Sequence, residues 1–160
     1  VTIQGYGVLV FTTDAIDWGS GYINQGEDYA VLDTYTGTVE NGTWTPQSGG
    51  LILENQGNKP FIHLDLNSFS NNADSFIGGT TPLYQIRVNN RSLNSCGNST
   101  HHLDTWYNLN STDEIRICSP FNYSSGNNSI EIDIKLGIPV DSKQGSISDS
   151  IVATGWGADV

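Results

Sequence analysis

Several residue types are scarce in this chain of 160 residues. It contains no Met, two Cys, five Pro, and six Lys and Arg against 17 Asp and Glu, so the formal net charge is −11. So few cations argue against a nucleic-acid partner, because phosphate binding needs clustered positive charge. They argue equally against an anionic membrane surface. No apolar run approaches the roughly 20 residues of a membrane-spanning helix, so no membrane insertion is expected.

The absence of Met also bears on where the protein works. The chain starts at Val1 and has no Met anywhere, which is typical of an exported polypeptide whose signal segment has been removed. We therefore expect a secreted, extracellular protein on the cell surface. In that setting Cys96 and Cys118 predict one disulfide, with two free buried thiols as the alternative.

What is present is the composition of an all-β domain. Gly, Asn, Ser and Thr are abundant, helical periodicity is nearly absent, and short β-branched runs end at turn residues. About eight strands in this length predict a single jelly-roll or immunoglobulin-like β-sandwich. The strands are expected near residues 2–12, 29–38, 50–56, 60–67, 82–89, 114–118, 129–138 and 147–156.

Three stretches carry the clearest strand patterns. Between Ile130 and Leu136, apolar residues alternate with charged ones, which predicts a strand with one face in the core and one in water. The stretch 51–66 reads as a hairpin, because residues 55–58 supply turn residues between two apolar runs. The stretch 136–153 reads as a second strand-turn-strand unit.

Catalytic and metal-binding patterns were sought and none was found. The chain has no G-x-S-x-G, H-E-x-x-H or P-loop motif, so we predict no enzyme, no catalytic residue and no cofactor. The adjacent His101 and His102 would point to opposite faces of a strand and make a poor metal chelate. Loops 14–17 and 67–74 are rich in Asp and Asn and could hold Ca²⁺, but they lack EF-hand spacing, so no metal site is predicted.

Six N-x-S/T motifs are a candidate modification signal. Chance would give roughly three in a chain this rich in Asn, Ser and Thr, but five of the six cluster between residues 90 and 129. Covalent N-glycans are one interpretation, and ordinary use of Asn in turns is the other. The acceptor residues are Asn41, Asn90, Asn98, Asn110, Asn122 and Asn127.

Aromatic residues suggest an alternative function. The four Trp residues, Trp18, Trp44, Trp106 and Trp156, could form a platform on which sugars stack. The protein would then be a secreted carbohydrate-binding module that uses Trp18, Trp44 or Trp106, with glycans as partners. Core or interface packing is the competing interpretation of the same residues. A secreted hydrolase is a third hypothesis, and no motif requires it.

The N-terminal strand is apolar on both faces. With period two, Val1, Ile3, Leu9 and Phe11 share one face, and Tyr6, Val8 and Val10 share the other. Such a strand must be central or covered. Gly5 and Gly7 suggest a bulge, a hinge or a close backbone approach. The strand could complete its own sandwich or add to an open sheet edge of a neighbour.

Two segments resemble a known group of proteins. Leu51-Ile-Leu-Glu-Asn-Gln-Gly-Asn-Lys-Pro-Phe-Ile-His-Leu64 resembles a strand unit of exported β-sandwich filament subunits. The stretch Ile138-Pro-Val-Asp-Ser-Lys-Gln-Gly-Ser-Ile-Ser-Asp-Ser-Ile-Val-Ala-Thr154 resembles their final hairpin. The group includes TasA/camelysin-like fibres, archaeal bundling pili and threads, and glycosylated fibrils of environmental microbes.

The resemblance implies a function. In such proteins the N-terminal strand fills a groove in the next subunit, so residues 1–12 would be a donor strand and residues 13–160 the β-sandwich body. The protein would be a homopolymer joined head to tail, a contact that propagates without closing. The expected function is that of a structural subunit of an extracellular, N-glycosylated filament. The donor residues would be Val1, Ile3, Tyr6, Val8, Leu9, Val10 and Phe11.

Overall fold

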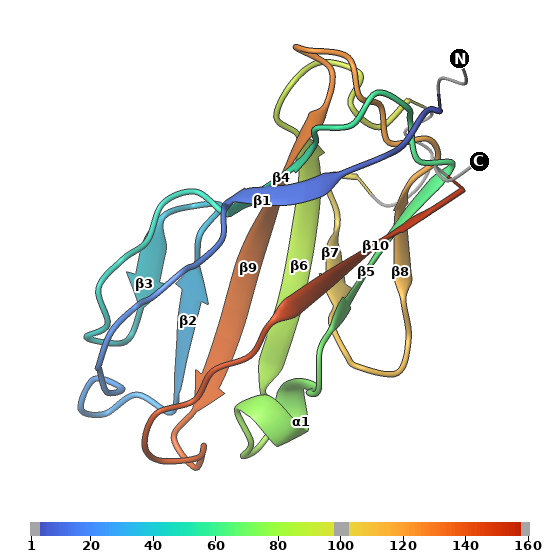
Figure 1. The fold of residues 1–160 in the computed structure, drawn as a ribbon. Coiled ribbons are helices and arrows are strands. Elements are labelled where there is room, and N and C mark those ends of the chain that lie inside the picture. Colours follow the sequence, from blue (N-terminus) through green and yellow to red (C-terminus); the bar gives the residue numbers. More distant parts are fainter. Residues whose placement is uncertain (1–3, 98–102, 158–160) are drawn as a thin grey trace.

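Ten β-strands form two antiparallel sheets that face each other in the computed structural model, which describes residues 4–97 and 103–157 (Figure 1). This confirms the predicted all-β sandwich. The strands are β1 (Leu9–Thr13), β2 (Tyr29–Asp33), β3 (Thr38–Glu40), β4 (Leu51–Asn55), β5 (His63–Ser68), β6 (Leu83–Asn90), β7 (Trp106–Asn108), β8 (Ile115–Cys118), β9 (Ser129–Pro139) and β10 (Ile151–Trp156), and the one short helix is α1 (Ala73–Phe76).

The large sheet is organised around β9, its longest strand. One edge of β9 pairs with β6, and β7 lies beyond β6. The other edge is shared, because the first half of β9 pairs with β4 and the second half with β2. β1 lies outside β4, and β3 lies outside β2. The small sheet has the order β10-β5-β8.

The core lies between the two sheets. Ile130, Ile132, Ile134 and Leu136 of β9 are all buried, as their alternation predicts, and Leu64 of β5 is buried on the facing sheet. Each such side chain contributes roughly 1.5–3 kcal/mol through removal from water. Period-two alternation therefore places β9 with its apolar face inward.

All eight predicted strands have a counterpart, with two differences in detail. The stretch 29–38 divides into β2 and β3, because a turn lies between them. β7 and α1 were not predicted, since three and four residues are too short for a periodic pattern to show. α1 begins after Asn72, whose side chain accepts a hydrogen bond from the backbone N–H of Ser75.

Both predicted hairpins are wrong. β4 and β5 do not pair with each other, since β4 pairs with β1 and β9 and β5 pairs with β10 and β8. The link between them crosses from the large sheet to the small one. β9 and β10 likewise belong to different sheets. Local turn residues are compatible with either arrangement, and the choice depends on which apolar faces meet across the core.

The N-terminal strand is an edge strand, so the prediction that it is central or covered is wrong. β1 pairs only with β4, and its residues cross the predicted boundary between residues 12 and 13. Tyr6 and Val8, which precede it, are exposed by 55% and 37%. Two apolar side chains of the N-terminal segment are thus left in water, although the strand that follows them pairs with β4. Val1 and Ile3 lie outside the described residues.

The outer face of β9 also differs from the prediction. Glu131 and Lys135 are partly exposed, but Asp133 between them is only 1% exposed. The turn after β2 covers it, because the Thr34 hydroxyl donates a hydrogen bond to Asp133 Oδ1 at 2.8 Å. The face that was expected to meet water therefore contains a buried carboxylate.

We predict that Asp133 makes the protein more stable in mild acid than at neutral pH. The pKa of Asp133 is raised to about 6, chiefly by burial and also by the nearby Glu131 and Asp33 carboxylates, while the hydrogen bond from Thr34 and the charge of Arg87 act to lower it. The folded-state pKa lies above the roughly 3.9 of an unfolded Asp. Its contribution is therefore complete below about pH 4 and lost as the pH rises through about 6.

The variant Asp133→Asn tests this pH dependence. Urea unfolding of both proteins at about pH 4 and about pH 7.5 should show that the wild type loses roughly 2 kcal/mol more over this interval than the variant. The difference between the two proteins isolates Asp133 from the other carboxylates, which are common to both. Equal pH dependence of the two proteins would contradict the assignment.

Candidate functional site

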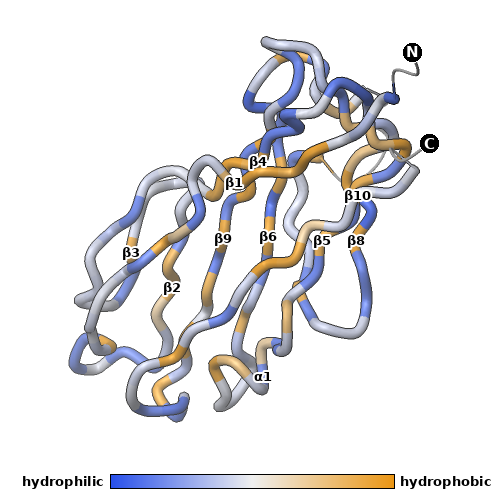
Figure 2. Tube along the Cα trace, viewed as in Figure 1, coloured by the Kyte–Doolittle hydropathy of each residue, from blue (hydrophilic) through white to orange (hydrophobic). Residues whose placement is uncertain are grey.

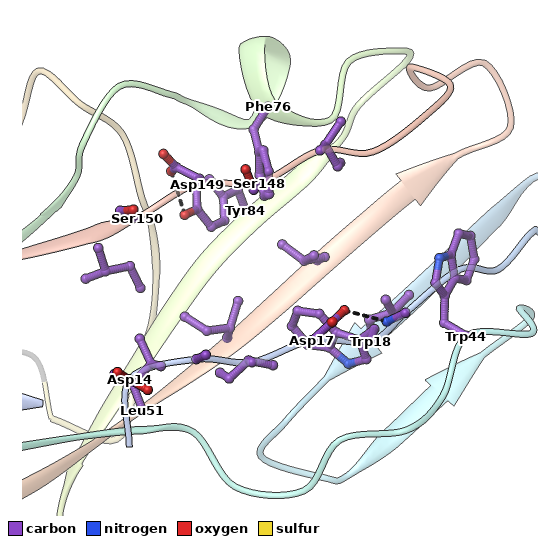
Figure 3. Close-up of a pocket in the computed structure, with 18 of the residues that line it drawn as sticks. Asp14, Asp17, Trp18, Trp44, Leu51, Phe76, Tyr84, Ser148, Asp149 and Ser150 are labelled. Atoms are coloured by element: carbon purple, nitrogen blue, oxygen red, sulfur yellow. Dashed lines mark hydrogen bonds between the residues drawn. The ribbon is translucent and has the colours of Figure 1, made fainter. Parts of the chain in front are cut away.

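An apolar groove runs across the inner face of the large sheet, between two segments that form no strand. One wall is residues 14–19, which follow β1, and the other is residues 147–150, which lead into β10 (Figure 3). The groove has a volume of about 630 Å³. Its floor is made by Leu32, Leu51, Tyr84, Ile134, Leu136 and Ile138. Core side chains of four strands therefore line a space that the small sheet leaves uncovered.

The groove continues into a second space, which is bordered by the loops that follow β1 and β9. This part has a volume of about 810 Å³ and lies between residues 19–23 and residues 142–147. Trp44, Ile138 and Ile147 line both parts. Two exposed apolar side chains, Tyr22 and Val140, line the second part, with 70% and 59% of their surface in water.

Asp149 fixes the wall next to β10. Its carboxylate accepts hydrogen bonds from the Tyr84 hydroxyl at 2.7 Å, from Asn71 Nδ2 at 3.1 Å and from the Ser68 hydroxyl. Figure 3 shows Tyr84 reaching from the floor to this wall. Burial raises the pKa of Tyr84, and the hydrogen bond to Asp149 raises it further, so the phenol stays protonated and keeps donating.

The opposite wall, residues 14–19, contains a buried polar group whose hydrogen bond is not made within the described residues. Trp18 packs against the core, yet its indole N–H is buried and has no hydrogen-bond partner among the described residues. A buried donor left without an acceptor costs about 1–3 kcal/mol. The described residues that line the first part of the groove include Asp14, Asp17 and Asp149, with no Lys or Arg. The groove is thus apolar with an acidic rim.

β10 presents an open edge beside the groove, because it is the last strand of the small sheet. On its paired side, Phe69 N–H donates to Ser150 O and Ile62 N–H donates to Trp156 O, each at 2.8 Å. Backbone groups of alternate residues point to opposite edges of a strand. The N–H and C=O groups of Ile151, Ala153 and Gly155 therefore point to the open edge.

The three Trp residues of the carbohydrate hypothesis do not form one platform. Trp18 and Trp44 line the groove, whereas Trp106 lies under the ammonium of Lys135, 4.1 Å from its ring centre, on the outer side of the large sheet. The Trp44 ring packs closely on Gly21 and Gly42, where a Cβ would lie 2.5 Å and 2.7 Å from ring atoms. Ring faces that a stacked sugar would need are already in contact with the protein.

The predicted disulfide is confirmed. Cys96 and Cys118 are bonded, with their Cα atoms 4.8 Å apart. Both are buried, and Cys96 also forms an isolated bridge with Phe121. The bond joins the segment after β6 of the large sheet to the end of β8 of the small sheet. A disulfide is consistent with an exported protein.

The predicted glycosylation sites fall into two groups. At Asn122 and Asn127, the side-chain nitrogen that would carry a sugar donates to the backbone carbonyls of Asn94, at 2.6 Å, and of Leu93. These two residues therefore hold the loop that precedes Cys96, which is the structural use of Asn that the alternative interpretation predicts.

The side chains of the other predicted glycosylation sites have different surroundings. Asn41 and Asn90 are exposed, and Asn90 Oδ1 accepts from the N–H of Cys96 at 2.9 Å. Asn110 Oδ1 accepts from the N–H groups of Thr112 and Asp113, which closes a turn. Asn98 lies outside the described residues. Glycosylation of these sites stays a prediction.

The described residues form no cluster of metal-binding side chains. No three His, Cys, Asp or Glu side chains gather within the described part of the chain. His101 and His102 lie outside it. His63 Nδ1 lies 2.8 Å from the Ser119 hydroxyl, but a nucleophile–base pair also needs a third group to orient the base. Among residues 4–97 and 103–157, none hydrogen-bonds to the other ring nitrogen.

Comparisons with known proteins identify no relative: no family model, curated protein or solved structure matches the chain. The resemblance to exported filament subunits therefore stays a prediction. The only helix in the described ranges has four residues, and none there could cross a membrane. Function must be argued from the groove and the strand edges.

From the sequence, Ile134 and Leu136 of the floor were predicted only as core residues, and the loop 14–17, Trp18 and Trp44 were considered only for other roles. Tyr84 and Asp149 were missed, and their contact joins residues 65 positions apart. One signal was available. Residues 13–28 and 139–146 are two stretches in which no strand is predicted, and each adjoins an apolar strand. Such stretches cover a sheet face poorly, since they form no ladder.

Proposed function

We propose that this protein is a structural subunit of an extracellular filament, in which the N-terminal segment of one copy adds as a strand to the groove of the next. The observation that carries the proposal is the groove itself, an apolar space about 630 Å³ in volume beside the open edge of β10. A sheet edge with unpaired backbone groups binds extended peptide by β-augmentation.

The groove suits an extended strand better than a small polar ligand. Apart from Tyr84 its floor is aliphatic, and an added strand would hydrogen-bond to Ile151, Ala153 and Gly155 while its alternate side chains entered the groove. Figure 2 shows that β1 and the first half of β10, the strands that border this space, consist largely of hydrophobic residues. An inserted strand would complete the sheet that faces β9.

The N-terminal segment is the occupant that fits best. Residues 4–13 contain no charged side chain, so they can enter a groove whose rim carries Asp14, Asp17 and Asp149. The segment also needs a partner, because Tyr6 and Val8 remain exposed in the isolated chain. Exposed apolar side chains beside an edge strand are typical of an interaction surface.

The positions of donor and acceptor favour an open chain of subunits. The N-terminal segment pairs with β4 of the large sheet, whereas the proposed acceptor is the open edge of β10 in the small sheet. Because donor and acceptor are different surfaces of one subunit, the contact between copies would be heterologous, and such a contact repeats along a fibre.

Deleting residues 1–7 should abolish the fibres that we expect to see by negative-stain electron microscopy of the purified protein. The variant keeps β1, so its urea unfolding midpoint should change little. A peptide of residues 1–13 should bind the deletion variant with one-to-one stoichiometry. A control peptide with Tyr6 and Val8 both replaced by Asp should not bind, because these are the apolar side chains that the segment leaves exposed on its own domain. Fibres that persist in the deletion variant would overturn the proposal.

A further inference from the structure

The N-terminal segment is held on its own domain by a surface separate from the groove. Two bonds join it to Asn58, because Tyr6 N–H donates to Asn58 Oδ1 at 2.8 Å and Asn58 N–H donates to Tyr6 O at 2.9 Å. Gln56 N–H donates to Val8 O at 2.7 Å. We call residues 55–58 together with Phe61 the cradle.

Asn55 organises the cradle from inside the fold, where it is fully buried. Its Oδ1 accepts from Val8 N–H at 3.2 Å and from Gly57 N–H at 3.0 Å. Its Nδ2 donates to the carbonyl of Lys59 at 2.9 Å. One buried amide thus shapes the turn and holds the N-terminal segment against it, so that both are positioned together.

The fit between the segment and the cradle is close on both sides. A Cβ on Gly57 would lie 2.2 Å from Tyr6 O and 2.7 Å from Gly7 Cα. A Cβ on Gly7 would lie 2.4 Å from Cζ of the Phe61 ring. Of the three possibilities that the sequence left open for Gly5 and Gly7, the structure shows a close approach of the backbone at Gly7, whereas a Cβ on Gly5 would meet only the Lys59 side chain.

We infer that the cradle is a holding site that keeps each copy from donating its own N-terminal segment until the segment is released. This inference rests on the proposed strand donation and adds its regulation. The segment cannot both lie in its own cradle and extend into the groove of a neighbour. Release from the cradle is therefore the step that controls assembly, and the concentration of released segments sets its rate.

Gly57→Ala tests the inference without changing the donor. The nearest atoms to the new Cβ all belong to residues 6–8, and Gly57 does not have a left-handed φ, so Ala fits the turn but not the docked segment. Amide hydrogen exchange at Tyr6 and Val8 should speed up. The lag before fibres form should shorten roughly tenfold, the factor expected when one or two hydrogen bonds are lost. Gly5→Ala is the matched control, because its Cβ meets only the flexible Lys59 side chain, at 3.1 Å.

A reversible lock provides the second variant. A Cβ on Gly5 would lie 3.4 Å from Lys59 Cβ, close to the roughly 3.5–4.5 Å of a disulfide. The double variant Gly5→Cys, Lys59→Cys should form no fibres when oxidised and should assemble at the control rate after mild reduction. The native Cys96–Cys118 bond is buried and should survive that reduction.

The outcomes separate the inference from the proposed function. An oxidised lock that still assembles, or a released Gly57→Ala segment with an unchanged lag, would overturn the holding role and leave strand donation standing. If Gly57→Ala stopped assembly, the cradle would itself receive the neighbour's segment, which also overturns the inference. Failure of wild type and all variants to form fibres would overturn the proposed function.

Discussion

Ala153→Pro should abolish filament assembly while the fold stays intact. The N–H of Ala153 points to the open edge of β10, away from β5, because the flanking bonds to Ser150 and Trp156 set the alternation. Proline lacks that N–H and is tolerated in an edge strand where the N–H faces outward. The ladder with β5 loses no hydrogen bond, whereas a strand added from a neighbour loses one and meets the proline ring.

The measurement is electron microscopy of fibres together with urea unfolding of the same samples. Thr154→Ala is the matched control, since this residue lies next in the strand and its backbone groups point to β5, so it should assemble normally. Thr154→Pro should instead lower the stability of the fold by removing a ladder bond. Fibres formed by Ala153→Pro at the wild-type rate would exclude β10 as the acceptor edge.

Replacing Cys96 and Cys118 together by Ser should lower the free energy of unfolding by about 3 kcal/mol. The bond closes a loop over a sequence separation of 22 residues, and a loop of that size accounts for about this loss of chain entropy in the unfolded state. The loop contains β7 of the large sheet and β8 of the small sheet. The crosslink therefore limits how far the segments around Cys96 and Cys118 can separate in the unfolded chain.

Urea unfolding of the wild type with and without reductant provides an independent measurement. Reduction and the double Ser variant should lower the midpoint to a similar extent, because both open the same loop. A change below about 1 kcal/mol would mean that the native contacts of Cys96 and Cys118 are strained, or that the unfolded chain is already compact.

The sequence predicted local structure well where the pattern of neighbouring residues along the chain decides it. The alternation from Ile130 to Leu136 placed β9 and its inner face correctly, and the single pair of Cys residues predicted the disulfide. The pattern failed at Asp133, because the residues that cover it come from the turn after β2, 99 positions away at Thr34. No local periodicity reports what covers a face from so far along the chain.

Pairing partners were the least predictable feature. The runs around residues 51–55 and 63–66 are compatible with a hairpin, yet they lie in opposite sheets. Turn chemistry is compatible with a tight hairpin or with a crossing link, and only the fit of apolar faces across the core distinguishes them. The groove was missed for the same reason, since its floor comes from four strands and its walls from two distant loops.

The sequence alone determined that this chain is an all-β sandwich with one disulfide and an apolar, uncharged N-terminal segment, because alternation, turn residues and cysteine count act locally. Only the tertiary structure decided that this segment is an edge strand docked on its own domain, that Gly57 and Gly7 allow the docking, and that an apolar groove lies beside the open edge of β10. These features depend on which surfaces approach one another, and that follows from long-range packing and not from the order of residues along a strand.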